Sequence, residues 1–159
     1  MAKAPVPYFL SYAHRDGSLV DTLHEDLKVH LEISKAYEFR GWRDTGILPG
    51  EAWDDEIQAA ILECEMAILL VSPTFLSRPY IVEKEIPKLL DAGKVVIPVQ
   101  LRRVDIGRQD LRGLETLWMF GMPVTGGGAL TYSECQTRLK REQFALALYK
   151  AIEDRLRKR

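Results

Sequence analysis

The chain has 159 residues, 47% of them hydrophobic and 28% charged, which is enough to bury the core of one ordinary domain without metals or disulfides. Its formal net charge of -1 gives no electrostatic reason to bind nucleic acid directly or an acidic membrane. We expect one cytoplasmic domain over residues 1–159. The two cysteines lack CxxC spacing, and the start lacks the apolar core of a signal peptide. No apolar run approaches the roughly 20 residues that span a membrane.

The first predicted elements are a strand and an amphipathic helix. The aromatic run YFLSY at residues 8–12 predicts the strand, and the turn after it leads to Ser18 and Asp21, whose spacing is typical of a capping box. Leucines then recur every four residues, which places them on one buried helical face. These are Leu19, Leu23, Leu27 and Leu31.

A second strand, a loop and a second helix follow. YEFRGW at residues 37–42 alternates aromatic and polar residues like a strand near a sheet edge, and glycines and a proline mark an ordered loop at residues 43–51. Acidic residues crowd the first turns of the next helix, where the helix dipole favours anions, so they need no catalytic explanation. The buried face of this helix is expected to hold Trp53, Ile57, Ala60, Ile61 and Cys64.

The rest of the chain predicts three more strands and two more helices. The runs at residues 66–71 and 95–101 are continuously apolar, as in a parallel sheet that helices cover on both faces. Between them we expect a turn and then a helix from about residue 79 to 92, and residues 116–120 are a candidate fifth strand. A closing helix over residues 137–157 is expected to bury Leu139, Phe144, Leu148, Ile152 and Leu156.

This alternation of strands and helices favours an α/β fold with an open, parallel, doubly wound sheet. Sheets of this kind bind ligands beyond the carboxyl ends of their strands, where the strand order reverses. The loops at that end are residues 12–17, 43–51 and 72–80, so a functional site is expected among them.

Three segments in this order resemble the signature blocks of a Toll/interleukin receptor (TIR) domain of the prokaryotic type. They are FLSYAHRD, RDTGILPGEAWDDEI and ILLVSPTFLSRPYIVEKEIPKLL. The resemblance covers residues 7–101 well and implies a flavodoxin-like, open parallel five-stranded sheet with helices on both faces, in agreement with the pattern of elements. Because the sequence contains no recognisable sensor, we expect the domain to be one module of a longer protein.

The resemblance implies one of two functions. Many TIR domains, especially prokaryotic and plant ones, are NAD glycohydrolases, which release nicotinamide and ADP-ribose or a cyclic isomer of it when they self-associate in innate immunity, antiphage defence or cell-death signalling. Many animal TIR domains are instead scaffolds that act by homotypic assembly with other TIR domains. Fold alone does not decide between the two. The NAD-cleaving enzyme is our leading hypothesis, with NAD as substrate and no cofactor, and the non-enzymatic scaffold is the alternative.

Two glutamates in the third block are candidates for the catalytic carboxylate. On a helix Ile81 and Glu85 share a face, whereas Glu83 projects about 160° away from Glu85. Spacing alone favours Glu85 as a surface acid paired with Lys84 or Lys88. In prokaryotic TIR domains, however, the catalytic glutamate opens a Glu-Leu-Pro-like turn, which EIPKLL resembles, so the resemblance implies that Glu85 is catalytic.

A single carboxylate suits this reaction. Cleavage of the nicotinamide–ribose bond makes the ribose carbon oxocarbenium-like, and a nearby carboxylate stabilises that charge. The family often has a tryptophan four residues before the glutamate. Here Ile81 stands at that position and Tyr80 one residue earlier, which displaces the expected ring by one residue.

Further candidates for substrate binding come from the predicted loops. In the family the segment with Ser11, Tyr12 and Arg15 lines the nucleotide pocket, and a guanidinium such as that of Arg15 can grip a diphosphate bidentately. Tyr12 is equally well explained as a half-buried strand aromatic, and Asp44 as part of a local turn. The expected substrate-binding residues are Ser11, Tyr12, Arg15, Arg43, Asp44, Ser72, Tyr80 and Ile81.

The loop after the second strand is the family's main assembly loop. Apolar residues in an otherwise exposed loop suggest a partner, and the resemblance implies an assembly loop with Ile47, Leu48, Pro49 and Gly50. The three histidines lack metal-ligand spacing, so no metal is expected.

Two other classes of protein remain as weaker readings. A phosphoacceptor receiver shares the fold but needs an aspartate after the third strand, where this chain has Ser72. An enzyme similar to nucleoside deoxyribosyltransferases would also use a glutamate at such a crevice, but it would act on nucleosides.

Overall fold

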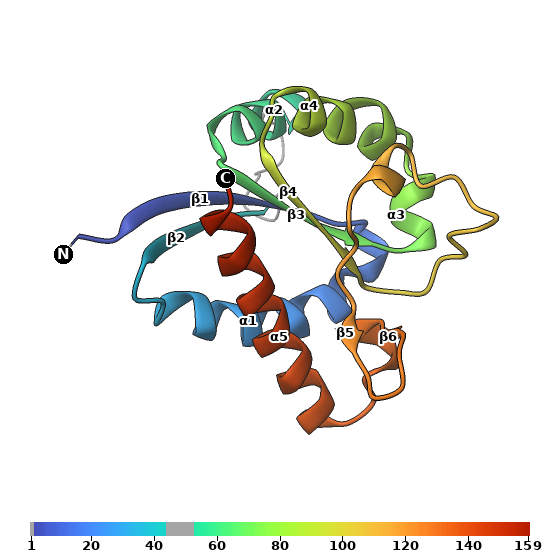
Figure 1. The fold of residues 1–159 in the computed structure, drawn as a ribbon. Coiled ribbons are helices and arrows are strands. Elements are labelled where there is room, and N and C mark those ends of the chain that lie inside the picture. Colours follow the sequence, from blue (N-terminus) through green and yellow to red (C-terminus); the bar gives the residue numbers. More distant parts are fainter. Residues whose placement is uncertain (1, 44–52) are drawn as a thin grey trace.

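A computed structural model describes residues 2–43 and 53–159 (Figure 1). Its main elements, in chain order, are β1 (Ala4–Ser11), α1 (Gly17–Glu32), β2 (Tyr37–Trp42), α2 (Trp53–Glu63), β3 (Met66–Val71), α3 (Pro73–Ser77), a π-helical turn (Ile81–Glu85), α4 (Ile86–Asp91), β4 (Val95–Gln100), β5 (Met122–Pro123), β6 (Ala129–Leu130) and α5 (Arg138–Arg157).

The central sheet is parallel and, in the described residues, has four strands in the order β2-β1-β3-β4. The α/β class with a flavodoxin-like parallel sheet is therefore confirmed. The segment expected as a fifth strand pairs only through Phe120, whose amide donates to the Pro98 carbonyl at 2.8 Å and whose carbonyl accepts from the Gln100 amide at 2.8 Å. A 3-10 turn at Leu114–Thr116 bends the chain just before residue 117, so the remaining residues cannot extend along β4.

Helices cover both faces of the sheet, α1 and α5 on one and α2 and α4 on the other (Figure 1). All six residues of β3 are buried. Met66, Ile68 and Leu70 pack in the core under α1 and α5, while Ala67 and Leu69 belong to the core on the opposite face. The continuous apolar runs predicted this two-sided burial correctly, because neither face of an inner parallel strand reaches water.

Most of the predicted helical faces are confirmed. Buried positions include Leu23, Leu27 and Leu31 in α1, Ile57, Ala60, Ile61 and Cys64 at α2, and Phe144, Leu148, Ile152 and Leu156 in α5. Leu139 is 64% exposed instead, because it lies in the first turn of α5, at the end of the helix far from the sheet (Figure 1). The side chain of Trp53 lies outside the described part of the chain.

The start of α1 differs from the predicted capping box. The helix begins at Gly17 with Asp16 at the N-cap position, so Ser18 lies inside the first turn. The carboxylate of Asp16 does not cap the helix but accepts hydrogen bonds from Ser72 and Arg102. Within the described residues, no helix has both the length and the apolar character needed to cross a membrane.

Candidate functional site

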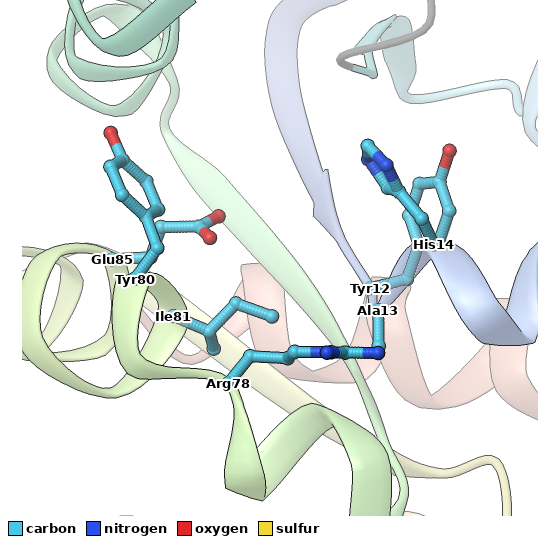
Figure 2. A pocket seen from close by; sticks show the side chains of 7 residues that line it. All are labelled: Tyr12, Ala13, His14, Arg78, Tyr80, Ile81 and Glu85. Carbon is cyan, nitrogen blue, oxygen red and sulfur yellow. The ribbon is translucent and has the colours of Figure 1, made fainter.

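A pocket of about 220 Å³ opens beyond the carboxyl ends of β1 and β3. The strand order reverses between these two neighbours, since β2 lies on one side of β1 and β3 on the other, and ligands bind at such points in open α/β sheets. Figure 2 shows the lining side chains on two walls, one from the loop after β1 and one from the segment after β3. They are Tyr12, Ala13, His14, Arg78, Tyr80, Ile81 and Glu85.

Glu85 is the buried carboxylate of this pocket. The residue is 6% exposed, and its carboxylate accepts a hydrogen bond of 3.1 Å from the hydroxyl of Ser11, the last residue of β1. Glu83, two residues earlier, is exposed. The prediction that Glu85 faces inward and Glu83 outward is confirmed, and the reading of Glu85 as a surface acid is wrong.

The helical segment before Glu85 contains a π turn. The amide of Ile86 donates to the carbonyl of Ile81, five residues back instead of the four of an α-helix. The wide turn lies just before Pro87, which has no amide hydrogen and therefore cannot continue the regular helical pattern.

The π turn changes which residues share a face with Glu85. Residues five apart come onto one side, so Tyr80 lines the pocket together with Glu85, while Ile81 still contributes to the same wall. Figure 2 shows the ring of Tyr80 beside the Glu85 carboxylate. The wider turn thus brings the aromatic ring of Tyr80, five residues before Glu85, onto the same wall as the carboxylate.

Tyr80 is also fixed at its hydroxyl end. The hydroxyl donates to the carboxylate of Asp54 and accepts from Nε2 of Gln58 at 3.1 Å, both on α2. Burial, together with the bond to Asp54, raises the pKa of Tyr80 to about 12. The phenol therefore stays neutral at physiological pH and holds the ring against the pocket wall.

Tyr12, on the opposite wall, is supported from behind by Arg43. The guanidinium carbon of Arg43 lies 4.8 Å from the centroid of the Tyr12 ring, within the range of a cation–π contact. Nη2 of Arg43 donates to Asp21 at 2.8 Å, and Nη1 lies 3.4 Å from Nδ1 of His24. Arg43 is not among the described lining residues, so it supports Tyr12 and does not itself face the pocket.

Burial shapes the electrostatics behind this wall. It lowers the pKa of His24 to about 4, and the positive charges of Arg43 and Lys28 add to the effect. Nε2 of His24 lies 2.9 Å from the hydroxyl of Tyr8. The imidazole is therefore neutral at physiological pH, which lets it lie beside the Arg43 guanidinium without repulsion between full charges.

Several expected substrate-binding residues lie elsewhere. Ser72 is fully buried; its hydroxyl accepts from the Phe75 amide at 3.0 Å and donates to Asp16 at 2.6 Å, so it caps α3 and stays out of the pocket. Arg15 is exposed and is not among the described lining residues. Asp44 and the assembly loop with Ile47, Leu48, Pro49 and Gly50 lie outside the described residues.

Ala13, His14 and Arg78 also line the pocket; they lie in the loops where the sequence places the site, but they are not among the expected substrate-binding residues. Arg78 is the C-cap residue of α3 and has an extended backbone, with φ −81° and ψ 118°. The following proline favours this conformation, and the pair Ser72-Pro73 marks the start of the short helix before it. Those signals predict where α3 begins and ends, but not the direction of the Arg78 side chain.

The fold is an α/β domain with a pocket at the switch point, at the carboxyl edge of its sheet. The family model for the TIR domain matches residues 9–124, and the chain belongs to the TIR domain family. A comparison with curated proteins found no match. In the described residues, no group of three or more His, Cys, Asp or Glu side chains is arranged to hold a metal ion.

Proposed function

We propose that this TIR domain is an NAD glycohydrolase and that Glu85 is its essential carboxylate. The observation that carries the proposal is the setting of Glu85, which is buried on the wall of the switch-point pocket and oriented by the hydroxyl of Ser11. A carboxylate buried among apolar residues acts strongly on a nearby charge, because little water screens it.

The reaction needs little beyond this group. As the bond between the ribose C1′ and the nicotinamide nitrogen lengthens, both bonding electrons leave with the nitrogen, so the cationic ring departs as neutral nicotinamide. The sugar carbon becomes oxocarbenium-like, and Glu85 stabilises the positive charge. Water adds to C1′ and loses a proton, which yields ADP-ribose; attack by an atom of the adenine base instead yields a cyclic isomer.

The size of the pocket fits part of the substrate. Its volume of about 220 Å³ lies below the roughly 300–1,000 Å³ of sites that enclose a whole drug-sized ligand. In the proposal, the nicotinamide and its ribose occupy the space between Tyr80, Tyr12 and Glu85. The diphosphate and the adenosine extend through the open side.

Self-association is part of the proposed mechanism. The predicted assembly loop, with Ile47 and Leu48, is proposed to join copies of the TIR domain in defence or cell-death signalling. The alternative function, a non-enzymatic scaffold, uses the same assembly but releases no nicotinamide.

The test compares nicotinamide release from NAD by the wild type, Glu85→Gln and Glu83→Gln at high protein concentration. Glu83 is the matched control, because it lies on the same helical turn and is exposed. We expect Glu85→Gln to lower kcat by about 10²–10³-fold, the range for loss of one electrostatic stabiliser, and Glu83→Gln to retain wild-type release. Equal release by wild type and Glu85→Gln removes Glu85 from the role, and assembly without any release supports the scaffold.

A further inference from the structure

Arg78 places a permanent positive charge in the pocket. It leaves the end of α3, and in Figure 2 its side chain runs along the lower side of the pocket toward Ala13, below Tyr80 and Glu85. Its backbone is held by the Arg78 amide, which donates to the Phe75 carbonyl at 3.3 Å. The side chain thus starts from a fixed point on the pocket rim.

Three other arginines at this edge of the sheet are bound to carboxylates, whereas Arg15 is exposed and is not among the described residues that line the pocket. Arg102 pairs with Asp16 at 2.9 Å, Arg103 with Glu134 at 2.6 Å and Arg112 with Asp110 at 3.1 Å. Arg78 forms no ion pair with a carboxylate in residues 2–43 and 53–159. Its guanidinium is therefore available to an anion that enters the pocket.

The two charges of the pocket both come from the segment after β3, but Arg78 runs below the Glu85 carboxylate (Figure 2), so together they suit a ligand of mixed charge. Glu85 faces the site proposed for the developing cation at C1′. A phosphate on C5′ of the same ribose lies across the sugar ring from C1′, so it points away from Glu85 when C1′ points toward it. The Arg78 guanidinium, along the lower side of the pocket, can bind such a phosphate through two parallel N–H donors.

We propose that Arg78 binds the diphosphate of the dinucleotide, on the nicotinamide side, and so selects phosphorylated over unphosphorylated nicotinamide ribosides. This inference rests on the proposed function. It moves the diphosphate contact from Arg15, where the sequence suggested it, to a residue that lines the pocket. Arg78 is a binding residue in this assignment and takes no part in bond cleavage.

The test measures binding and cleavage separately on the full chain. Binding of ADP-ribose is followed by calorimetry for the wild type, Arg78→Ala, Arg78→Lys, Arg15→Ala and Arg108→Ala. The side chain of Arg108 is 88% exposed and lies near Asp105, so Arg108→Ala controls for loss of one surface charge. Cleavage is followed with NAD, nicotinamide mononucleotide and nicotinamide riboside, and thermal melting verifies that each variant is folded.

We expect Arg78→Ala to weaken ADP-ribose binding about ten- to hundredfold, as for loss of hydrogen bonds to a charged group. The KM for NAD and for the mononucleotide should rise by a similar factor with little change in kcat, while cleavage of nicotinamide riboside stays as in the wild type. Arg78→Lys should lie between Arg78→Ala and the wild type, because it keeps the charge but loses the paired donors.

Each outcome decides a separate point. Unchanged ADP-ribose affinity and NAD KM in Arg78→Ala, or a loss seen in Arg15→Ala instead, overturns the assignment. An equal loss with nicotinamide riboside also overturns it, since that substrate has no phosphate. If the wild type cleaves none of the three substrates but Arg78→Ala still weakens ADP-ribose binding, the proposed function fails and the diphosphate contact stands.

Discussion

The hydroxyl of Ser11 donates a hydrogen bond of 3.1 Å to a carboxylate oxygen of Glu85, 74 residues further along the chain. Ser11 ends β1 and Glu85 ends the π turn after β3, so the bond joins the two walls of the pocket. The Ser11 hydroxyl helps to orient the carboxylate, which suits a group whose charge is proposed to act on the substrate.

Ser11→Ala should separate orientation from charge. Without the hydroxyl, the Glu85 carboxyl group stays in place but loses one hydrogen bond that orients it, so we expect kcat to fall by about tenfold, less than for Glu85→Gln. The free energy of unfolding should fall by about 1 kcal/mol, the net worth of one hydrogen bond. Nicotinamide release and urea denaturation measure the two effects, and a loss as large as that of Glu85→Gln would show that Ser11 does more than orient.

Tyr80 gives a second prediction, which tests the contribution of its ring separately from that of its hydroxyl. Tyr80→Phe keeps the ring and removes the bonds to Asp54 and Gln58, so we expect a stability loss of about 1 kcal/mol and nearly unchanged kcat. Tyr80→Ala removes the ring as well and should raise the KM for NAD by about tenfold through lost stacking.

A double-mutant cycle checks the link between Tyr80 and α2. Tyr80→Phe and Asp54→Ala are made singly and together, and their unfolding free energies are compared. We expect a coupling energy of about 0.5–3 kcal/mol, as for residues in direct contact. Additive effects would mean that the bond to Asp54 contributes nothing to the position of the ring.

The parts of the fold that the sequence predicts well are those where burial alone sets the pattern. Residues 66–71 form β3 without any shift of its ends, because an inner strand covered on both faces must be apolar throughout. Residues 116–120 are apolar too, yet only Phe120 pairs with β4. Hydrophobicity marks both segments, but pairing also depends on the path of the preceding turn, which local sequence does not determine.

The site shows the same limit. Helical geometry places Glu85 on the same face as Ile81, but spacing alone favours Glu85 as a surface acid, and its place in the pocket is implied by the resemblance to TIR domains. Tyr80 is an expected substrate-binding residue, but the π turn that brings it onto the wall of Glu85 is a change in hydrogen bonding that periodicity does not reveal. Ser72 stands at the expected strand end, but its hydroxyl is taken up by Asp16 and the Phe75 amide.

Asp16 gives a prediction about stability. Its buried carboxylate accepts from Ser72 at 2.6 Å and from Arg102 at 2.9 Å, and so ties together the chain segments after β1, β3 and β4. Asp16→Ala leaves the buried Ser72 hydroxyl without this partner, and we expect a loss of about 2–3 kcal/mol.

Arg102→Ala is the informative comparison for Asp16. The side chain of Arg102 is 46% exposed, so water screens much of its ion pair with Asp16. We expect Arg102→Ala to lower the free energy of unfolding by about 1 kcal/mol or less. Urea denaturation at neutral pH measures both variants. Equal losses would mean that the ion pair, and not the buried hydrogen bond to Ser72, dominates the contribution of Asp16.

His24 predicts how stability depends on pH. Burial and the nearby charges of Arg43 and Lys28 lower its pKa in the folded protein to about 4, against the usual 6.5 of a histidine. The unfolded chain therefore binds the proton first as the pH falls. The contribution of neutral His24 is complete above pH ~6.5 and is lost progressively down to pH ~4, by on the order of 3 kcal/mol.

The difference between wild type and His24→Gln isolates this effect, because carboxylates that titrate in the same range are common to both chains. Glutamine does not titrate and can still hydrogen-bond to the hydroxyl of Tyr8. We expect the wild type to lose more unfolding free energy than His24→Gln between pH 7 and pH 4.5, measured by urea denaturation at each pH. Parallel curves would mean that His24 binds its proton equally well in the folded and unfolded chains. In that case a neutral imidazole beside Arg43 is not needed to hold Tyr12 in place.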